Sequence, residues 1–246
     1  MSREDSFLTA DIGDMFKHTA LVRHPLEEQF RDFEHQTETA RLGIWLFLAT
    51  EVMFFGALFL TVGIYRYQYA EAFEKASERL NWQIGSINTL VLLVSSFTMV
   101  LAVYYAKLGD RRRLIRYLLL TAAIGAVFLV LKGLEYYLDY RDNLIPGWRF
   151  EPREWIGQGG LSPDQVPSVK LFLLMYFVMT AIHAVHLTIG ITIILILAAL
   201  AARKRFTSEY YTPIDVTGLY WHFVDIVWIF LLPMLYLLGT HKLNGG

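Results

Sequence analysis

Five long apolar stretches, separated by shorter polar segments, dominate the hydropathy pattern of the chain. They cover residues 42–65, 84–106, 117–138, 171–202 and 216–240. About 20 predominantly apolar residues are needed for an α-helix to cross the hydrocarbon core of a bilayer, and each stretch is at least that long. The pattern therefore predicts an all-α, polytopic membrane bundle of five transmembrane helices.

Polar segments flank the predicted bundle. Residues 1–41 mix charged residues with scattered apolar ones, which predicts an N-terminal extramembrane segment, and the Pro-, Gly- and Trp-rich residues 139–170 predict a long outer loop. Lysine and arginine gather in the first segment and in the connections 107–116 and 203–205. By the positive-inside rule, the N-terminus should be cytoplasmic and the C-terminus outside.

Composition narrows the class of function. The chain is 55% hydrophobic and 18% charged, and its formal net charge is -1. These values are typical of a membrane protein and give no reason to expect nucleic acid as a partner. The absence of cysteine excludes disulfides, thiolate metal sites and cysteine nucleophiles from this sequence.

Several ionisable residues lie inside the apolar stretches. An ionised acid at the middle of a transmembrane helix costs roughly 2.5 to 3.5 kcal/mol on insertion scales, so such a residue usually faces protein, pairs with a neighbour or stays protonated. We predict that these residues form a protonatable interior. The set is Glu51, Glu135, His183, His186, His222 and Asp225.

Depth along the helices predicts one contact within this set. Glu51 and Asp225 each lie nine residues from the predicted inner start of a span, or roughly 14 Å deep at 1.5 Å per residue. His222 is slightly shallower, and His183 and His186 lie nearer the middle and outer half. We therefore expect Glu51 to contact His222 or Asp225 across the bundle.

Other polar pairs allow more than one interpretation. His183 and His186 share a helix face, a spacing that is also found in metal sites. A zinc or iron site needs three or four ligands, however, and the predicted spans contain only one further histidine, His222. We expect hydrogen bonds between helices and no metal. Lys132 and Glu135 are also three residues apart, and they could either pair and extend to the headgroups or serve a function.

Two other classes of membrane protein also place polar residues inside the membrane. An independent proton or ion transporter would also need carboxylates in the membrane, but internal repeats or broken helices are expected there and neither is visible. An intramembrane desaturase or hydroxylase would need many clustered histidines, whereas the chain has seven in total. Both classes therefore fit the sequence less well than a hydrogen-bonded, protonatable bundle.

Five strings in the apolar stretches carry a family resemblance. In chain order they are LFLATEVMFFGALF, INTLVLLVSSFTM, LKGLEYY, FVMTAIHAVHLTIG and GLYWHFVDIVWIFL. Together they resemble subunit III of the haem-copper oxidases, most closely that of cytochrome c oxidase. The resemblance covers roughly residues 41 to 240.

The resemblance implies an accessory oxidase subunit with no catalytic residue, redox centre or metal of its own. Haem and copper are then expected in partner subunits: the catalytic subunit I, subunit II and possibly subunit IV. The implied role is to stabilise subunit I and to support proton uptake, with phospholipids bound against the helices. The family's polar positions fall on Glu51, Asn88, Glu135, His183, His186, Trp221, His222 and Asp225, of which Asn88 and Trp221 are expected to act in helix packing or hydrogen bonding.

The number of spans and the electron donor refine this expectation. Longer family members have two further N-terminal helices, so this chain is similar to the five-span form of many bacterial oxidases, in the cytoplasmic membrane. Cytochrome c is the donor that the resemblance favours. The alternatives are subunit III of a quinol oxidase and a homologue associated with nitric oxide reductase.

Overall fold

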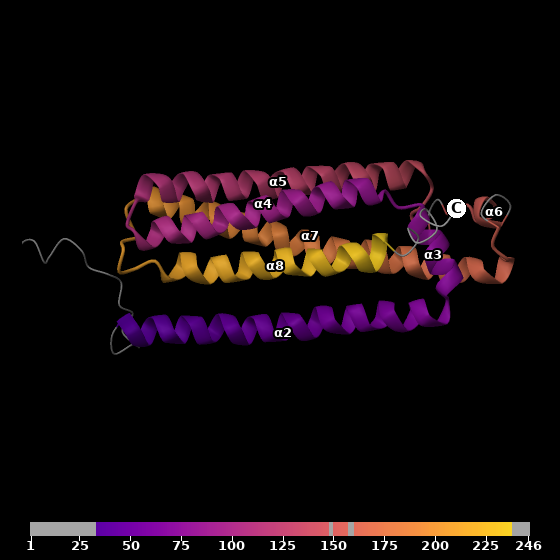
Figure 1. Ribbon diagram of the computed structural model, residues 1–246, viewed down its shortest axis with the longest axis horizontal. Helices are drawn as coiled ribbons and strands as arrows, with labels where there is room; N and C mark the ends of the chain where they lie inside the picture. The colour runs from indigo at the N-terminus through magenta and orange to yellow at the C-terminus, as the bar shows by residue number, and fades with distance from the viewer. Residues whose placement is uncertain (1–32, 148–149, 157–159, 238–246) are drawn as a thin grey trace, which may run out of the picture. The chain divides into compact units, whose positions relative to one another are not determined.

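The computed structural model describes residues 33–147, 150–156 and 160–237, and this part of the chain is helical without strands. The long helices are α2 (Phe33–Gln68), α4 (Trp82–Lys107), α5 (Arg111–Arg141), α7 (Val166–Ala202) and α8 (Thr212–Tyr236), shown in Figure 1. Shorter elements are α3 (Ala70–Glu78), α6 (Pro152–Ile156) and the 3-10 turn η1 (Pro163–Gln165). The five long helices are each apolar enough to cross a membrane, which confirms the predicted fold class.

The helices extend beyond the predicted spans. Helix α2 begins nine residues before residue 42, and α5 continues to Arg141, so Asp139 belongs to a helix and not to the predicted outer loop. The rest of that loop contains α6, η1 and the first turn of α7. Residues 1–32 of the predicted N-terminal segment and residues 238–240 of the fifth predicted span lie outside the described residues.

The chain divides into two units at the boundary between Gly43 and Ile44. The described part of the first unit, residues 33–43, forms the first turns of α2. The second unit contains the remainder of α2 and all later helices, and everything below concerns this unit.

Four helices of the second unit pack in a closed ring. Helix α4 contacts α5, α5 contacts α7, α7 contacts α8, and α8 contacts α4 (Figure 1). The indole of Trp221, fully buried on α8, lies against Gly125 of α5 and Gly190 of α7. A Cβ atom built at Gly125 would come within 2.8 Å of this ring, so glycine is what allows these helices to approach so closely.

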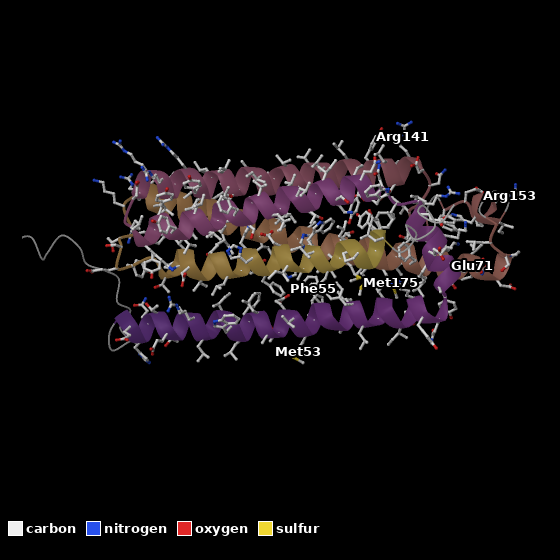
Figure 2. All side chains as sticks on the ribbon, viewed as in Figure 1. Met53, Phe55, Glu71, Arg141, Arg153 and Met175 are labelled. Atoms are coloured by element: carbon white, nitrogen blue, oxygen red, sulfur yellow. The ribbon has the colours of Figure 1, made fainter. Side chains whose placement is uncertain are left out.

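Aromatic side chains contribute to the contact between helix α2 and this ring. Figure 2 shows Phe55 directed from α2 towards the neighbouring helices and Met53 directed away, in agreement with exposed fractions of 2% and 77%. The Phe55 ring centroid lies 5.4 Å from that of His186 and 6.2 Å from that of Phe223, while Phe59 lies 6.2 Å from Phe230. Aromatic pairs at such separations pack favourably.

The turn between α4 and α5 is fixed by local chemistry. Gly109 adopts a φ of +71°, a conformation that residues with a side chain rarely adopt. Asp110 then caps α5 by accepting a hydrogen bond from the Arg113 backbone amide at 3.1 Å. Arg111 donates to the backbone carbonyls of Ala201 and Ala202. A cation here complements the C-terminal end of α7 and joins the two helices.

Candidate functional site

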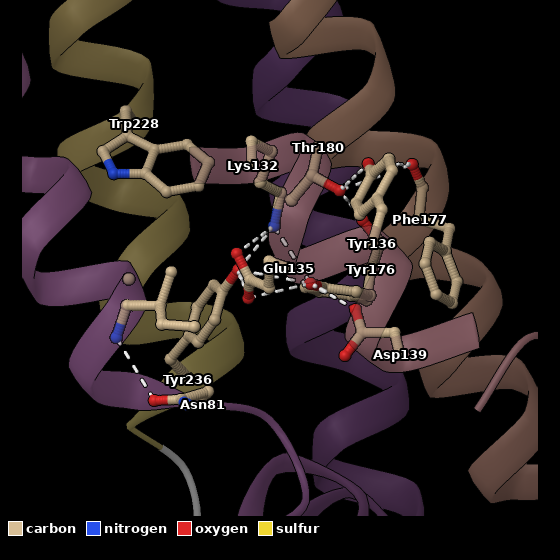
Figure 3. Close-up of polar contacts among 12 residues, drawn as sticks. Asn81, Lys132, Glu135, Tyr136, Asp139, Tyr176, Phe177, Thr180, Trp228 and Tyr236 are labelled. Atoms are coloured by element: carbon tan, nitrogen blue, oxygen red, sulfur yellow. Dashed lines mark hydrogen bonds and ion pairs between the residues drawn. The ribbon is translucent and has the colours of Figure 1, made fainter. Parts of the chain in front are cut away.

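A buried polar cluster lies near the C-terminal ends of α5 and α8, where both contact α7. Its centre is Lys132, which is 2% exposed, and Figure 3 shows the side chains around it. Glu135 and Asp139 come from the same face of α5, because residues spaced by three and four positions are neighbours on a helix. Tyr176 from α7 and Tyr236 from α8 complete the group, which we call the Lys132 cluster.

Each hydrogen of the Lys132 ammonium has an acceptor in the cluster. The Nζ atom lies 3.0 Å from Glu135 Oε2, 2.9 Å from the Tyr176 hydroxyl and 2.6 Å from the Tyr236 hydroxyl. Three acceptors match the three donor hydrogens of a lysine ammonium. Lys132 is therefore held inside the protein. The sequence allowed two interpretations, and the one in which Lys132 and Glu135 pair and extend to the lipid headgroups is wrong.

The two tyrosines connect the cation to the carboxyl groups. Tyr236 donates to Glu135 Oε1 at 2.7 Å. The Tyr176 hydroxyl lies 3.0 Å from the same oxygen and 3.1 Å from Asp139 Oδ2. Glu135 and Asp139 are 1% and 5% exposed. Buried charges are tolerated only when paired and hydrogen-bonded, and Lys132 and Glu135 meet both conditions through their ion pair and the tyrosine hydroxyls.

Surrounding aromatic rings support the cation. The Lys132 Nζ atom lies 4.6 Å from the Tyr176 ring centroid, 5.0 Å from that of Tyr136 and 5.5 Å from that of Trp228. An ammonium within about 6 Å of a ring centroid is attracted by the ring's electrons. Tyr136 is itself held by Thr180, whose hydroxyl oxygen lies 2.6 Å away. Packed aromatic side chains thus surround the Lys132 ammonium.

Glu51 pairs with His186, which joins α2 to α7. Glu51 Oε2 lies 3.1 Å from His186 Nε2, and both side chains are mostly buried. His186 Nδ1 lies 2.9 Å from the Ile182 carbonyl, which can only accept, so Nδ1 carries a hydrogen. The contact at Nε2 then holds one proton, on the carboxyl group or on the imidazole.

The sequence-based prediction for the partner of Glu51 was wrong. It named His222 or Asp225, whereas Glu51 contacts His186. The prediction counted depth from residue 42, but α2 begins at Phe33. The ends of the apolar stretches therefore do not define the register of α2 against α7 and α8, and this register determines which side chain meets Glu51.

His222 has a different partner. Its Nδ1 atom lies 2.7 Å from the Ser96 hydroxyl, which links α8 to α4. Asp225, one helical turn further along α8, is 3% exposed and lies near Ser96. Neither of its carboxyl oxygens has a hydrogen-bond partner by geometry among the described residues.

Three other predicted residues are buried without a hydrogen bond to the described protein. The polar side-chain atoms of Asn88, His183 and Trp221 lack a partner there. His183 packs between aromatic rings, 5.5 Å from Phe128 and 5.1 Å from Trp228 by ring centroids. The Trp221 ring packs against Gly125 and Gly190. Trp228, not Trp221, makes the indole hydrogen bond, to Thr89 at 3.1 Å.

The sequence pattern did not reveal three of the five residues of the Lys132 cluster. Asp139 was assigned to the outer loop, although its spacing of four from Glu135 would place it on the same face of a longer helix. Tyr176 and Tyr236 gave no such signal, since each comes from another helix and tyrosine is common at the ends of membrane helices. Among the described residues, no group of three His, Asp or Glu side chains is arranged to hold a metal ion.

Comparison with known proteins adds independent evidence. Residues 168–240, a range that includes most of α7 and all of α8, match the family model described as "Cytochrome c oxidase subunit III". The chain is also similar to proteins named "Probable quinol oxidase subunit 3". Those of Staphylococcus haemolyticus and Staphylococcus epidermidis are 26% and 25% identical over 205 residues, and that of Staphylococcus aureus is 26% identical over 206.

These relatives match along most of their length. In each case the alignment covers 83% of this chain and 92% of the relative. The match to the family model, the similarity to relatives named as third oxidase subunits and the five apolar helices agree with the motifs found in the sequence. The chain is a multi-pass membrane protein that is similar, over most of its length, to third subunits of the haem-copper oxidases.

Proposed function

We propose that this chain is the accessory third subunit of a haem-copper oxidase that takes its electrons from a quinol. The observation that carries the proposal is the set of relatives named as quinol oxidase subunits, each aligned over 92% of its length. The sequence motifs favoured cytochrome c as the donor and kept quinol as the alternative. The relatives support the alternative.

Within that complex, the proposed role is to stabilise the catalytic subunit and to support proton uptake. The Lys132 cluster and the Glu51–His186 pair both consist of groups that bind protons and are shielded by packed helices. Buried polar networks of this kind are rigid and keep their members in fixed positions. Haem and copper would belong to partner subunits, with which this chain would assemble.

Many apolar side chains on the outer surface of the helices support assembly within the membrane. In the most apolar part of each long helix, at most half of the residues are buried by this chain. In a bilayer, the exposed remainder contacts lipid or another transmembrane subunit. We place the complex in a bacterial cytoplasmic membrane, with the N-terminus in the cytoplasm and phospholipids against the helices.

The choice of donor is tested by oxygen consumption. The complex is purified through a tag on this chain and supplied with a reduced quinol or with reduced cytochrome c. We expect rapid oxygen consumption with quinol and only a background rate with cytochrome c. Rapid turnover with cytochrome c and none with quinol would reverse the proposed donor while leaving the family unchanged.

The accessory role is tested by removing the chain. We expect a complex prepared without it to retain its haem spectrum and its initial rate of oxygen consumption. The rate should then decline over repeated turnovers faster than that of the complete complex. Loss of the haem spectrum would show that the chain is required for assembly of the catalytic subunit, and an unchanged time course would contradict a role in proton uptake.

A further inference from the structure

The Lys132 cluster contains more acceptors than its hydrogens can serve when both carboxyl groups are ionised. Lys132 uses its three hydrogens on Glu135, Tyr176 and Tyr236. Tyr236 uses its single hydrogen on Glu135 Oε1. Only the Tyr176 hydrogen remains to serve the other two contacts of that hydroxyl.

Those two contacts compete for one hydrogen. The Tyr176 oxygen lies 3.0 Å from Glu135 Oε1 and 3.1 Å from Asp139 Oδ2, both within hydrogen-bond distance. If Tyr176 donates to one carboxylate, the other would face its oxygen with no hydrogen between them. Two buried carboxylates would also share the single positive charge of Lys132, which is costly where water is excluded.

One additional proton resolves both problems. With a proton on Asp139 Oδ2, that group donates to the Tyr176 oxygen, and Tyr176 donates to Glu135. Every close contact then contains a hydrogen, and one ammonium balances one carboxylate. We propose that the Lys132 cluster is a proton-binding site that holds a single proton shared between Asp139 and Glu135 through the Tyr176 hydroxyl.

The geometry also allows this proton to change its position. As the Oδ2–H bond of Asp139 breaks, its proton joins the Tyr176 oxygen, and the original Tyr176 proton forms an O–H bond with Glu135 Oε1. Tyr176 remains a neutral phenol at the end of the step. The net change is the transfer of one proton from Asp139 to Glu135, with the total charge of the cluster unchanged.

The charged and titratable groups around the site come from all three helices that form it. Lys132, Glu135, Tyr136 and Asp139 lie on α5, and Asp142 follows at its C-cap; Tyr176 comes from α7 and Tyr236 from α8.

A polar hollow of about 300 Å³ lies beside the last turn of α5. It is lined by Arg79, Arg141, Asp142, Asn143 and Leu144. Leu144 donates its amide hydrogen to the Asp139 carbonyl at 3.0 Å. The Asp139 backbone is thus bonded to a residue that lines this hollow, whereas Glu135 lies one helical turn further from the end of α5.

Infrared spectroscopy of the complete purified oxidase tests the shared proton. A protonated carboxyl group has a C=O stretching band that an ionised carboxylate lacks. In Asp139→Asn, the amide can replace the protonated acid as a donor to Tyr176, so we expect assembly together with loss of one such band. In Glu135→Gln, Lys132 is left with one carboxylate, so Asp139 ionises and the same band is lost.

Two further variants complete the test. Asp142→Asn changes an exposed carboxyl group at the end of the same helix and should retain the band. Tyr176→Phe keeps both acids but removes their bridge, so the band should remain at a shifted frequency. Retention of the band in both Asp139→Asn and Glu135→Gln, or its loss in only one of them, would overturn the proposal. The result does not depend on which electron donor the oxidase uses.

Discussion

At the scale of single residues, the interior of this subunit is organised by a lysine as much as by the expected acids. Lys132 serves three acceptors and lies against several aromatic rings. Glu51, the acid in the most apolar surroundings of the sequence, has a simpler partner in His186. In both sites, polar side chains form hydrogen bonds with one another inside the protein, where little water is present to replace those bonds.

Removing the Lys132 cation should strongly destabilise the bundle. Lys132→Met leaves Glu135 and Asp139 without a neighbouring positive charge. Removing one partner of a buried ion pair typically lowers the free energy of unfolding by about 3 to 5 kcal/mol. The thermal unfolding midpoint of the purified complex should fall. Lys75→Met, which removes an exposed partner of Glu78, should leave the midpoint nearly unchanged. Equal midpoints for the two variants would contradict a structural role for the buried ammonium.

The Glu51–His186 pair predicts a variant that assembles but lacks a proton site. In Glu51→Gln, the amide can donate to His186 Nε2 as a protonated acid would, so the complex should form in normal yield. An apolar carbodiimide should label the wild-type chain at Glu51 and fail to label this variant, whereas Glu78→Gln should leave the labelling intact. A large loss of assembly in Glu51→Gln would show that the residue acts structurally.

At the scale of elements, two glycines and one tryptophan determine how closely three helices approach. Gly125 of α5 and Gly190 of α7 leave the space that the Trp221 ring fills. Such contacts matter in a membrane, because lipid offers the helices an equally apolar environment and close packing must hold them together.

Adding one methyl group should loosen this contact. Gly125→Ala places Cβ 2.8 Å from the Trp221 ring, and overpacking of this kind typically costs about 1 to 3 kcal/mol. Gly133→Ala is a matched control on the same helix, where no heavy atom lies within 4 Å of the new Cβ. The unfolding midpoint should fall for the first variant and stay level or rise for the second, because alanine favours helix. A fall of equal size in both would contradict the packing account.

The elements were more predictable than their contacts. The lengths of the apolar stretches alone indicated five spans, because a helix needs about 20 apolar residues to cross a bilayer. Spacing placed Lys132 and Glu135 on one face of α5, and it could have included Asp139 had the helix been extended. The partnership of Glu51 with His186 depends on the registers of α2 and α7, which the ends of an apolar stretch do not define. Tyr176 and Tyr236 join the cluster only through tertiary packing.

At the scale of the whole molecule, the chain supplies protonatable groups and a membrane-embedded surface, and its proposed function depends on partners. Large apolar side chains are exposed along all five long helices, including Met53 at 77%. A membrane subunit presents such a surface to lipid or to other subunits. The exposed apolar surface therefore agrees with the proposed role as one subunit of a larger membrane assembly.

The central claim, that this chain works inside a haem-bearing oxidase, is tested most directly by isolating it with its partners. The tagged chain is recovered from native membranes in mild detergent, and the reduced-minus-oxidised visible spectrum is recorded together with the identities of the co-purifying proteins. We predict haem bands and a large catalytic oxidase subunit. A colourless preparation without that subunit, recovered under conditions that keep such complexes intact, would contradict the account.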